Sequence, residues 1–299
     1  MKNSNKNKRK PKPDSVFQVK VEGDLMSFLL EMIPFKNKNN IKSLLLNNQV
    51  EVNGRIVSKH NHIVKPNSEV KIKWERSPVT KSFRGFSIVF EDEHLVVIDK
   101  HAGILSVGTE SERDNTAYSF LSKHVKREGV NKKIFIVHRL DKETSGLMVF
   151  AKSQEIQHLM QDNWKDVLVE RAYIAIVEGV IEEDEGVVSS YLHENNAYVV
   201  FSDQNPEGGK KAVTNFKVLK RTPEYSLLEV RLATGRKNQI RVHMKEIGHP
   251  IINDKKYGAS TNPINRLGLH SKILGFVHPV TGKVMRFETP MPRKFTYLF

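Results

Sequence analysis

The chain has 299 residues, with 48 Lys+Arg against 34 Asp+Glu, so its formal net charge is +14. This basic excess favours a polyanionic partner such as nucleic acid, although charge can also serve solubility alone. The absence of cysteine excludes disulfides, thiolate nucleophiles and cysteine-ligated metal sites, and it indicates a cytoplasmic protein. Because no run approaches the ~18 apolar residues of a membrane span, we expect a soluble protein of one large or two modest domains.

The first 14 residues form a basic segment in which Met1 is the only large apolar side chain. Such a segment cannot bury enough surface to offset its ordering entropy, so we expect a disordered tail over residues 1–14. An amphipathic helix follows, with Asp24 as its N-cap. Its apolar stripe consists of Leu25, Phe28, Leu29, Met32 and Ile33.

The next segment predicts a small domain over residues 15–75. A short second helix near Ile41 is followed by VEVNGRIV, whose Asn53-Gly54 pair is a strong hairpin signal. Two helices followed by this hairpin and by the alternating SEVKIKW resemble the S4-like RNA-binding module. The resemblance implies that Lys42 and Arg55 contact RNA phosphates. A generic small α/β domain with a solvated basic face remains the alternative.

Residues 76–86 contain Pro78 and Gly85 with little periodicity and are predicted to be a linker. Residues 87–299 contain many short strand-like runs and only three helical patterns, near 116–126, 153–163 and 237–247. This order predicts an α+β fold with a mixed, mostly antiparallel sheet, preceded by the small α/β domain.

The stretch HRLDKETSG, residues 138–146, places Asp141 in a probable loop before an apolar run. It is not a kinase loop, because Leu140 separates Arg139 from Asp141 and the downstream Asn is missing. Ser145 lacks the G-x-S-x-G frame of hydrolases. The GILSVG stretch lacks the Lys-Ser/Thr of a phosphate loop, and the 12 histidines show no H-E-x-x-H zinc pattern. We therefore expect neither a nucleotide cofactor nor a metal.

Four segments occur in an order that resembles the RluA-type pseudouridine synthase family. They are IDKHAGILSV (98–107), HRLDKETSGLMVFAK (138–152), ERAYIAIVEG (170–179) and TGRKNQIRVHMKEIGHPIINDKKYG (234–258). The resemblance covers about residues 87–299 and implies a catalytic domain of pseudouridine synthase type. Such synthases often carry an S4-like module in front, so the two resemblances support each other.

The resemblance implies that Asp141 is the catalytic residue, with Tyr173 and Arg241 as its active-site partners. The sequence departs from the family pattern at His101, usually Pro, and at Asn238, usually His. The change at Asn238 could alter contacts near the RNA.

The implied chemistry suits these residue types. Isomerising uridine moves no atom in or out overall, so neither a redox cofactor nor a metal is demanded. One carboxylate suffices, as a nucleophile or as a base, and the sequence leaves that choice open. Arg241 would hold Asp141 ionised, and Arg139 is placed to touch RNA. Taken alone, Asp141 could instead be a turn residue bonding the backbone of Thr144 or Ser145.

The sequence thus predicts an RNA pseudouridine synthase that acts without a cofactor, and large-subunit ribosomal RNA is its predicted substrate. Transfer RNA is the alternative substrate, and a non-catalytic RNA-binding or ribosome-assembly protein is the alternative function. We expect a monomer with no membrane partner.

Overall fold

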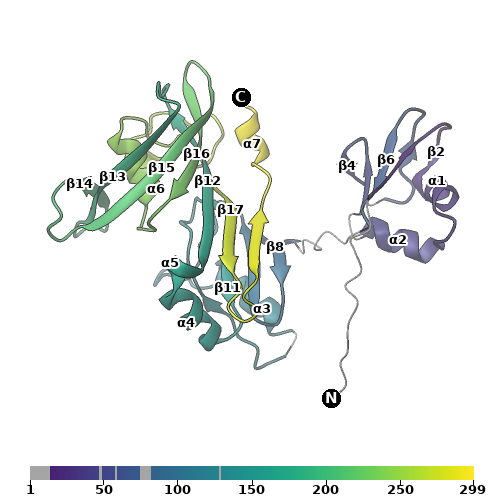
Figure 1. Cartoon of the computed structure of the whole chain (residues 1–299), viewed down its shortest axis with the longest axis horizontal. Coiled ribbons are helices and arrows are strands. Elements are labelled where there is room, and N and C mark those ends of the chain that lie inside the picture. Colours follow the sequence, from purple (N-terminus) through teal and green to yellow (C-terminus); the bar gives the residue numbers. More distant parts are fainter. Residues whose placement is uncertain (1–13, 47–48, 58, 75–81, 128) are drawn as a thin grey trace. The chain divides into compact units, whose positions relative to one another are not determined.

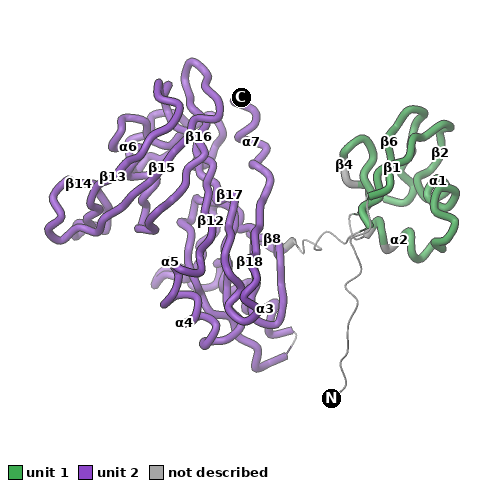
Figure 2. The backbone as a smooth tube through the Cα atoms, viewed as in Figure 1, with its two compact units in different colours: residues 1–80 green, residues 81–299 purple. Residues whose placement is uncertain are grey.

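The computed structural model describes residues 14–46, 49–57, 59–74, 82–127 and 129–299. The chain divides into two compact units, residues 1–80 and 81–299 (Figure 2). The predicted tail lies outside the described residues except for Asp14, and so does the predicted linker up to residue 81. Each unit is described by itself below.

The first unit combines two helices with short strands. Its elements are β1 (Ser15–Gln18), β2 (Gly23–Asp24), α1 (Leu25–Met32), α2 (Lys38–Leu46), β3 (Val50–Val52), β4 (Arg55–Ile56), β5 (Ile63–Val64) and β6 (Glu69–Ile72). The order β1-β6-β3-β4 forms one sheet, and β2 pairs with β5. The predicted N-cap is confirmed, because the Asp24 carboxylate accepts the Ser27 N–H at 3.0 Å.

The predicted hairpin of the first unit is also confirmed. Asn53 and Gly54 join β3 to β4 with φ angles of 50° and 73°, the left-handed values that a two-residue turn of this kind requires. Asn and Gly adopt these angles more readily than other residues, which explains why the sequence signal was clear. The assignment of this unit as an S4-like module stays a prediction.

The second unit is built around one sheet (Figure 1). Its strands are β7 (Ser82–Phe83), β8 (Phe86–Glu91), β9 (Leu95–Lys100), β10 (Phe135–Ile136), β11 (Ser145–Ala151), β12 (Leu168–Glu178), β13 (Glu185–Glu194), β14 (Val200–Asp203), β15 (Lys210–Arg221), β16 (Tyr225–Leu232), β17 (Leu269–Val277) and β18 (Val284–Glu288). Its helices are α3 (Ala117–Val125), α4 (Gln154–Asp162), α5 (Trp164–Val167), α6 (Gln239–Glu246), a 3-10 turn (Lys255–Tyr257) and α7 (Arg293–Thr296).

Within the described residues these strands form a 12-stranded sheet with the main order β14-β13-β15-β16-β12-β17-β11-β9-β8-β7. The β11–β17 pair is parallel, whereas the other strand pairs recorded in this sheet are antiparallel. The predicted α+β class with a mixed, mostly antiparallel sheet is confirmed.

Two boundaries differ from the sequence prediction. Residues 82–86 are not a linker, because they form β7, the following turn and the start of β8. Gly85 makes that turn with φ 88°. The helix predicted over 237–247 begins only at Gln239, since Asn238 has φ 55° and cannot belong to a right-handed helix.

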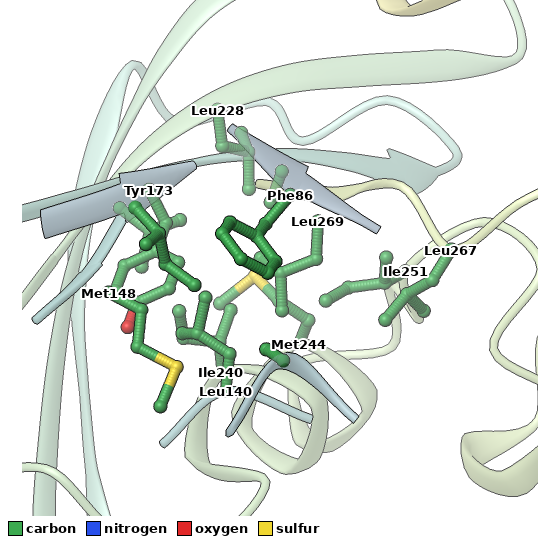
Figure 3. Packing of buried hydrophobic residues seen from close by; sticks show 14 of the residues in the cluster. Phe86, Leu140, Met148, Tyr173, Leu228, Ile240, Met244, Ile251, Leu267 and Leu269 are labelled. Atoms are coloured by element: carbon green, nitrogen blue, oxygen red, sulfur yellow. The ribbon is translucent and has the colours of Figure 1, made fainter. Parts of the chain in front are cut away.

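Both faces of the central strands are buried, and one face positions the functional loops. On β12, Tyr173 belongs to the large apolar cluster, whereas Ile174 belongs to a cluster on the opposite face. Ile240 and Met244 of α6 pack into the same cluster as Tyr173 (Figure 3). The predicted common face of alternate β11 residues is confirmed, since Leu147, Val149 and Ala151 share one cluster. No helix in the described parts of the chain is long and apolar enough to cross a membrane.

Gly146 offers a test of how tightly β11 and β17 are packed. Its φ is 112°, and a Cβ there would overlap the Ser271 carbonyl oxygen. We expect Gly146→Ala to lower the free energy of unfolding by more than about 3 kcal/mol. The backbone of Ser271 would have to move, and alanine would also be strained at this φ. Urea unfolding measures this loss.

Gly208→Ala is the matched control, since its φ is also positive, 72°, but nothing lies within 4 Å of an added Cβ. It should cost only about 1–2 kcal/mol. Equal losses in the two variants would contradict the close packing of β11 against β17.

Candidate active site

Residues 137–144 join β10 to β11 and carry Asp141, and buried side chains hold this loop in place. The Ser106 hydroxyl donates to the Leu140 carbonyl at 2.6 Å and accepts from the Leu140 N–H at 3.1 Å. The His138 ring accepts the Val149 N–H at 3.2 Å through Nε2. Burial, together with the charge of Arg171, lowers the pKa of His138 to about 3, so this ring stays a neutral acceptor.

Lys100, at the end of β9, anchors the same loop. Its side chain is fully buried, and Nζ donates to the carbonyls of His101 at 3.0 Å, Ile104 at 2.8 Å and Lys142 at 3.1 Å. Burial lowers the pKa of Lys100 to about 7, although the carboxylates of Glu143 and Asp141 oppose that shift. The end of β9 is therefore tied to the residue directly after Asp141.

The structure brings Asp141 and Arg241 together. Arg241 donates from a terminal nitrogen to Oδ2 of Asp141 at 3.1 Å, and the Asn238 side-chain amide donates to the same oxygen at 2.6 Å. The alternative role, in which the Asp141 side chain caps the turn at Thr144, does not occur. The Thr144 N–H instead donates to the backbone carbonyl of Asp141 at 3.2 Å. The carboxylate is thus left for contacts across the cleft.

Arg241 is itself held by a second carboxylate. Its Nε and second terminal nitrogen donate to Asp254 at 2.6 and 2.7 Å, a two-point pairing with a side chain only 1% exposed. The guanidinium also lies 5.0 Å from the ring centroid of Tyr257. Burial would lower the pKa of Arg241, but the hydrogen bonds and charges of Asp254 and Asp141 outweigh it and raise that pKa. The site therefore contains a permanent, oriented positive charge.

Asn238 has a role that the sequence analysis did not predict. We expected this departure to affect contacts with RNA, whereas its amide contacts Asp141 directly. Its left-handed backbone suits Asn better than most residues. The Tyr257 hydroxyl donates to its side-chain oxygen at 3.3 Å, and burial raises the pKa of Tyr257 to about 12, so the phenol keeps its proton.

Gln239 fixes the loop of residues 234–238 and was missed from the sequence. Its side-chain oxygen accepts from the Thr234 hydroxyl at 2.8 Å and from the Arg236 N–H at 3.0 Å. Its nitrogen donates to the Val213 carbonyl at 3.0 Å and to the Thr214 hydroxyl at 2.9 Å. The amide therefore uses both of its donors and accepts twice, which holds this loop to β15. Gln239 is 2% exposed, and the sequence holds no signal of that burial, because the four groups that it bonds come from two separate segments.

Asp141, Asn238, Gln239 and Arg241 line an open cleft of about 1140 Å³ in the second unit. Tyr173 lies in its wall with 6% exposure, and its ring packs in the cluster that contains Leu140 and Ile240 (Figure 3). Arg139 is exposed and also lines the cleft. The cleft thus combines the Asp141 carboxylate held by Arg241, the aromatic ring of Tyr173 and several basic side chains, and it is large enough for an extruded nucleoside.

The predicted RNA-binding residues Lys42 and Arg55 belong to the first unit, whereas the residues that line the cleft belong to the second. Lys42 is exposed on α2, while the side chain of Arg55 lies outside what the structure describes. No group of three or more His, Cys, Asp or Glu side chains that could hold a metal ion occurs among the described residues.

Comparison with known proteins gives a consistent result. A family model described as RNA pseudouridylate synthase matches residues 94–246. The chain belongs to the RNA pseudouridine synthase family. It is 33% identical over 278 residues to the uncharacterized RNA pseudouridine synthase YhcT of Bacillus subtilis, covering 91% of each chain. Family membership makes the protein an isomerase that acts on RNA.

Two further relatives extend the comparison. The chain is 37% identical over 229 residues, 71% of each chain, to ribosomal large subunit pseudouridine synthase D of Zymomonas mobilis. The structure of human RNA pseudouridylate synthase domain containing 4 superposes with a TM-score of 0.59 at 25% identity, covering 70% of this chain and 90% of that one. The fold predicted from the sequence is therefore the fold of known synthases.

Asp254→Asn tests whether the second carboxylate orients Arg241. We expect kcat for uridine isomerisation to fall at least ~10-fold with little change in KM, because Arg241 loses its two-point charged partner. The free energy of unfolding should fall by about 3 kcal/mol. Asp184→Asn is the control, since its ion pair with Arg221 is exposed and should contribute less than about 1 kcal/mol. Wild-type kcat in Asp254→Asn would contradict the orienting role.

The lowered pKa of Lys100 should make the stability of the fold depend on pH. Between pH ~7 and ~10 the unfolded chain binds a proton at this lysine that the folded chain has released. The stability of the wild type should therefore rise with pH in this window relative to Lys100→Met, by at most about 1.4 kcal/mol per pH unit. Denaturant unfolding of both proteins across the window measures the difference. A difference that does not vary with pH would mean that Lys100 stays charged when folded.

Proposed function

We propose that this protein converts specific uridines of large-subunit ribosomal RNA to pseudouridine, with Asp141 as the catalytic carboxylate. The observation that carries the proposal is the position of Asp141 in the cleft, where Arg241 and Asn238 both bind its Oδ2. No hydrogen bond among the described residues engages its Oδ1. One oxygen is thus held while the other is free to react.

The reaction breaks the N1–C1′ bond of uridine, turns the base, and joins C5 to C1′. The proton at C5 is lost to solvent and N1 gains a proton, so the overall composition is unchanged. Asp141 can begin it as a nucleophile towards the nucleotide or as a base that removes a sugar proton, and both need an ionised carboxylate. Arg241 places a positive charge 3.1 Å from Oδ2 of this carboxylate. The Asn238 amide fixes the direction in which the carboxylate points.

Tyr173 and Arg139 complete the proposed site. The uracil must leave its stack to reach Asp141, and an aromatic side chain in the cleft wall gives it a surface to lie against. Arg139 is exposed two residues before Asp141, so it can contact the RNA at the place that the base vacates. These roles depend on side chains that border the same cleft.

Several features support ribosomal RNA as the substrate. The similarity to a relative named as a large-subunit ribosomal synthase is one. The formal charge of +14 and the predicted S4-like unit, with Lys42 and Arg55, are others. We propose that the protein acts as a monomer in the cytoplasm.

Tritium release from RNA labelled at C5 of uridine tests the proposal, because joining C5 to C1′ must expel that hydrogen. The wild type should release tritium from large-subunit ribosomal RNA, and Asp141→Asn should reduce release at least ~1000-fold. RNA affinity should not fall, since the substitution removes a negative charge. Asp166→Asn is a matched control, because this exposed carboxylate also borders the cleft.

Release from transfer RNA and not from ribosomal RNA would reassign the substrate class while keeping the role of Asp141. Full release by Asp141→Asn would refute the mechanism. Tight RNA binding without release from either RNA would favour the non-catalytic alternative.

A further inference from the structure

Tyr198 is an exposed aromatic residue held in a strained turn. It lies between β13 and β14, and its side chain is 74% exposed. Its φ of 58° is a left-handed value that a tyrosine rarely adopts. Neither burial nor local conformational preference explains a large aromatic side chain here. Strain of this kind, when the surroundings enforce it, points to a function.

The turn around Tyr198 is firmly built. The Asn195 side-chain oxygen accepts the N–H groups of Ala197 and Val199, both at 3.0 Å. The Tyr198 N–H donates to the Asn195 carbonyl at 2.9 Å, and the Asn195 N–H donates to the Val199 carbonyl at 3.0 Å. The ring is thus presented to solvent from a rigid support.

Two lysines contact Tyr198. The ammonium groups of Lys237 and Lys256 both donate to the Tyr198 carbonyl at 3.4 Å. That of Lys237 also lies 5.6 Å from the centroid of the Tyr198 ring. The nearby carboxylate of Glu194 is already paired with Lys237. An exposed aromatic face beside two positive charges therefore forms a single local surface.

This surface adjoins the proposed active site. Lys237 borders the cleft and directly precedes Asn238, which contacts Asp141. Lys256 lies 5.7 Å from the ring of Tyr257, which packs against Arg241. Lys237 and Lys256 therefore connect the turn of Tyr198 to Asn238 and Tyr257, which contact Asp141 and Arg241.

We propose that Tyr198 stacks on an unpaired base of the RNA beside the target uridine, while Lys237 and Lys256 contact the adjoining phosphates. The inference rests on the proposed action on RNA. When the target uridine leaves its stack, its neighbour loses a stacking partner, and the Tyr198 ring, beside the cleft-lining Lys237, can replace it. Aromatic faces flanked by basic side chains are how proteins bind single-stranded nucleic acid.

The matched variants are Tyr198→Ala, Tyr198→Phe and Tyr297→Ala. Phe keeps the ring and loses only the hydroxyl. Tyr297 is a similarly exposed tyrosine, 77%, at the end of α7. Phe295 of that helix packs with Ile174, on the face of β12 opposite to Tyr173. Tyr297→Ala therefore removes an equal aromatic surface away from the cleft.

Tritium release from a large-subunit ribosomal RNA transcript should give a KM about 10-fold higher for Tyr198→Ala, with kcat within two-fold of the wild type. Tyr198→Phe and Tyr297→Ala should match the wild type. Lys256→Gln should reduce the slope of log affinity against log salt by about one. An unchanged KM in Tyr198→Ala would overturn the proposal and leave this surface for a protein partner.

A second readout does not need turnover. RNA that contains 5-iodouridine, irradiated with the wild-type protein, should cross-link to the peptide containing Tyr198, and mass spectrometry identifies that peptide. Cross-links elsewhere in the second unit without any at Tyr198 would reject the stacking role. Tritium release by the wild type without this cross-link would leave the proposed function standing and refute only the inference about Tyr198.

Discussion

The site depends on the pairing of Arg241 with two carboxylates. Asp254 takes two of the guanidinium nitrogens and leaves the third for Asp141, so the orientation of the arginine determines where the Asp141 carboxylate is held. One partner is buried and the other faces the cleft. This division makes physical sense, because a buried charge without a partner is costly. Asp254 provides the buried partner of Arg241, and the Asp141 carboxylate faces the cleft.

The loops that meet in the cleft lack regular structure and are held by buried polar side chains instead. Lys100 bonds three carbonyl groups around the loop of Asp141. Gln239 bonds four groups around the loop of Asn238. Buried amides and ammonium groups are stable only when their hydrogen bonds are made, so each anchor fixes its loop in one arrangement. The rigid sheet can therefore hold Asp141 and Arg241, which are 100 residues apart in the sequence, at 3.1 Å.

Much of this arrangement could be predicted from local sequence. The cap at Asp24, the Asn53-Gly54 turn and the alternating faces of β11 follow from short-range rules, and they are confirmed. Family resemblance pointed to Asp141 and Arg241. The contact of Asn238 with Asp141 could not be predicted, since it joins two loops 97 residues apart. The start of α6 was misplaced because a left-handed residue leaves no mark on hydrophobic periodicity.

Asn238 also changes how the site can respond to pH. A histidine, the usual family residue at this position, would bring a group that titrates near neutrality next to Asp141. The amide of Asn238 and the guanidinium of Arg241 keep their protons across that range, and the pKa of Tyr257, about 12, lies above it. Lys100, with a pKa of about 7, is different, because its charge acts on Asp141 from below. Among these groups near Asp141, Lys100 is therefore the one whose charge changes near neutral pH, and it is the group that anchors the loop.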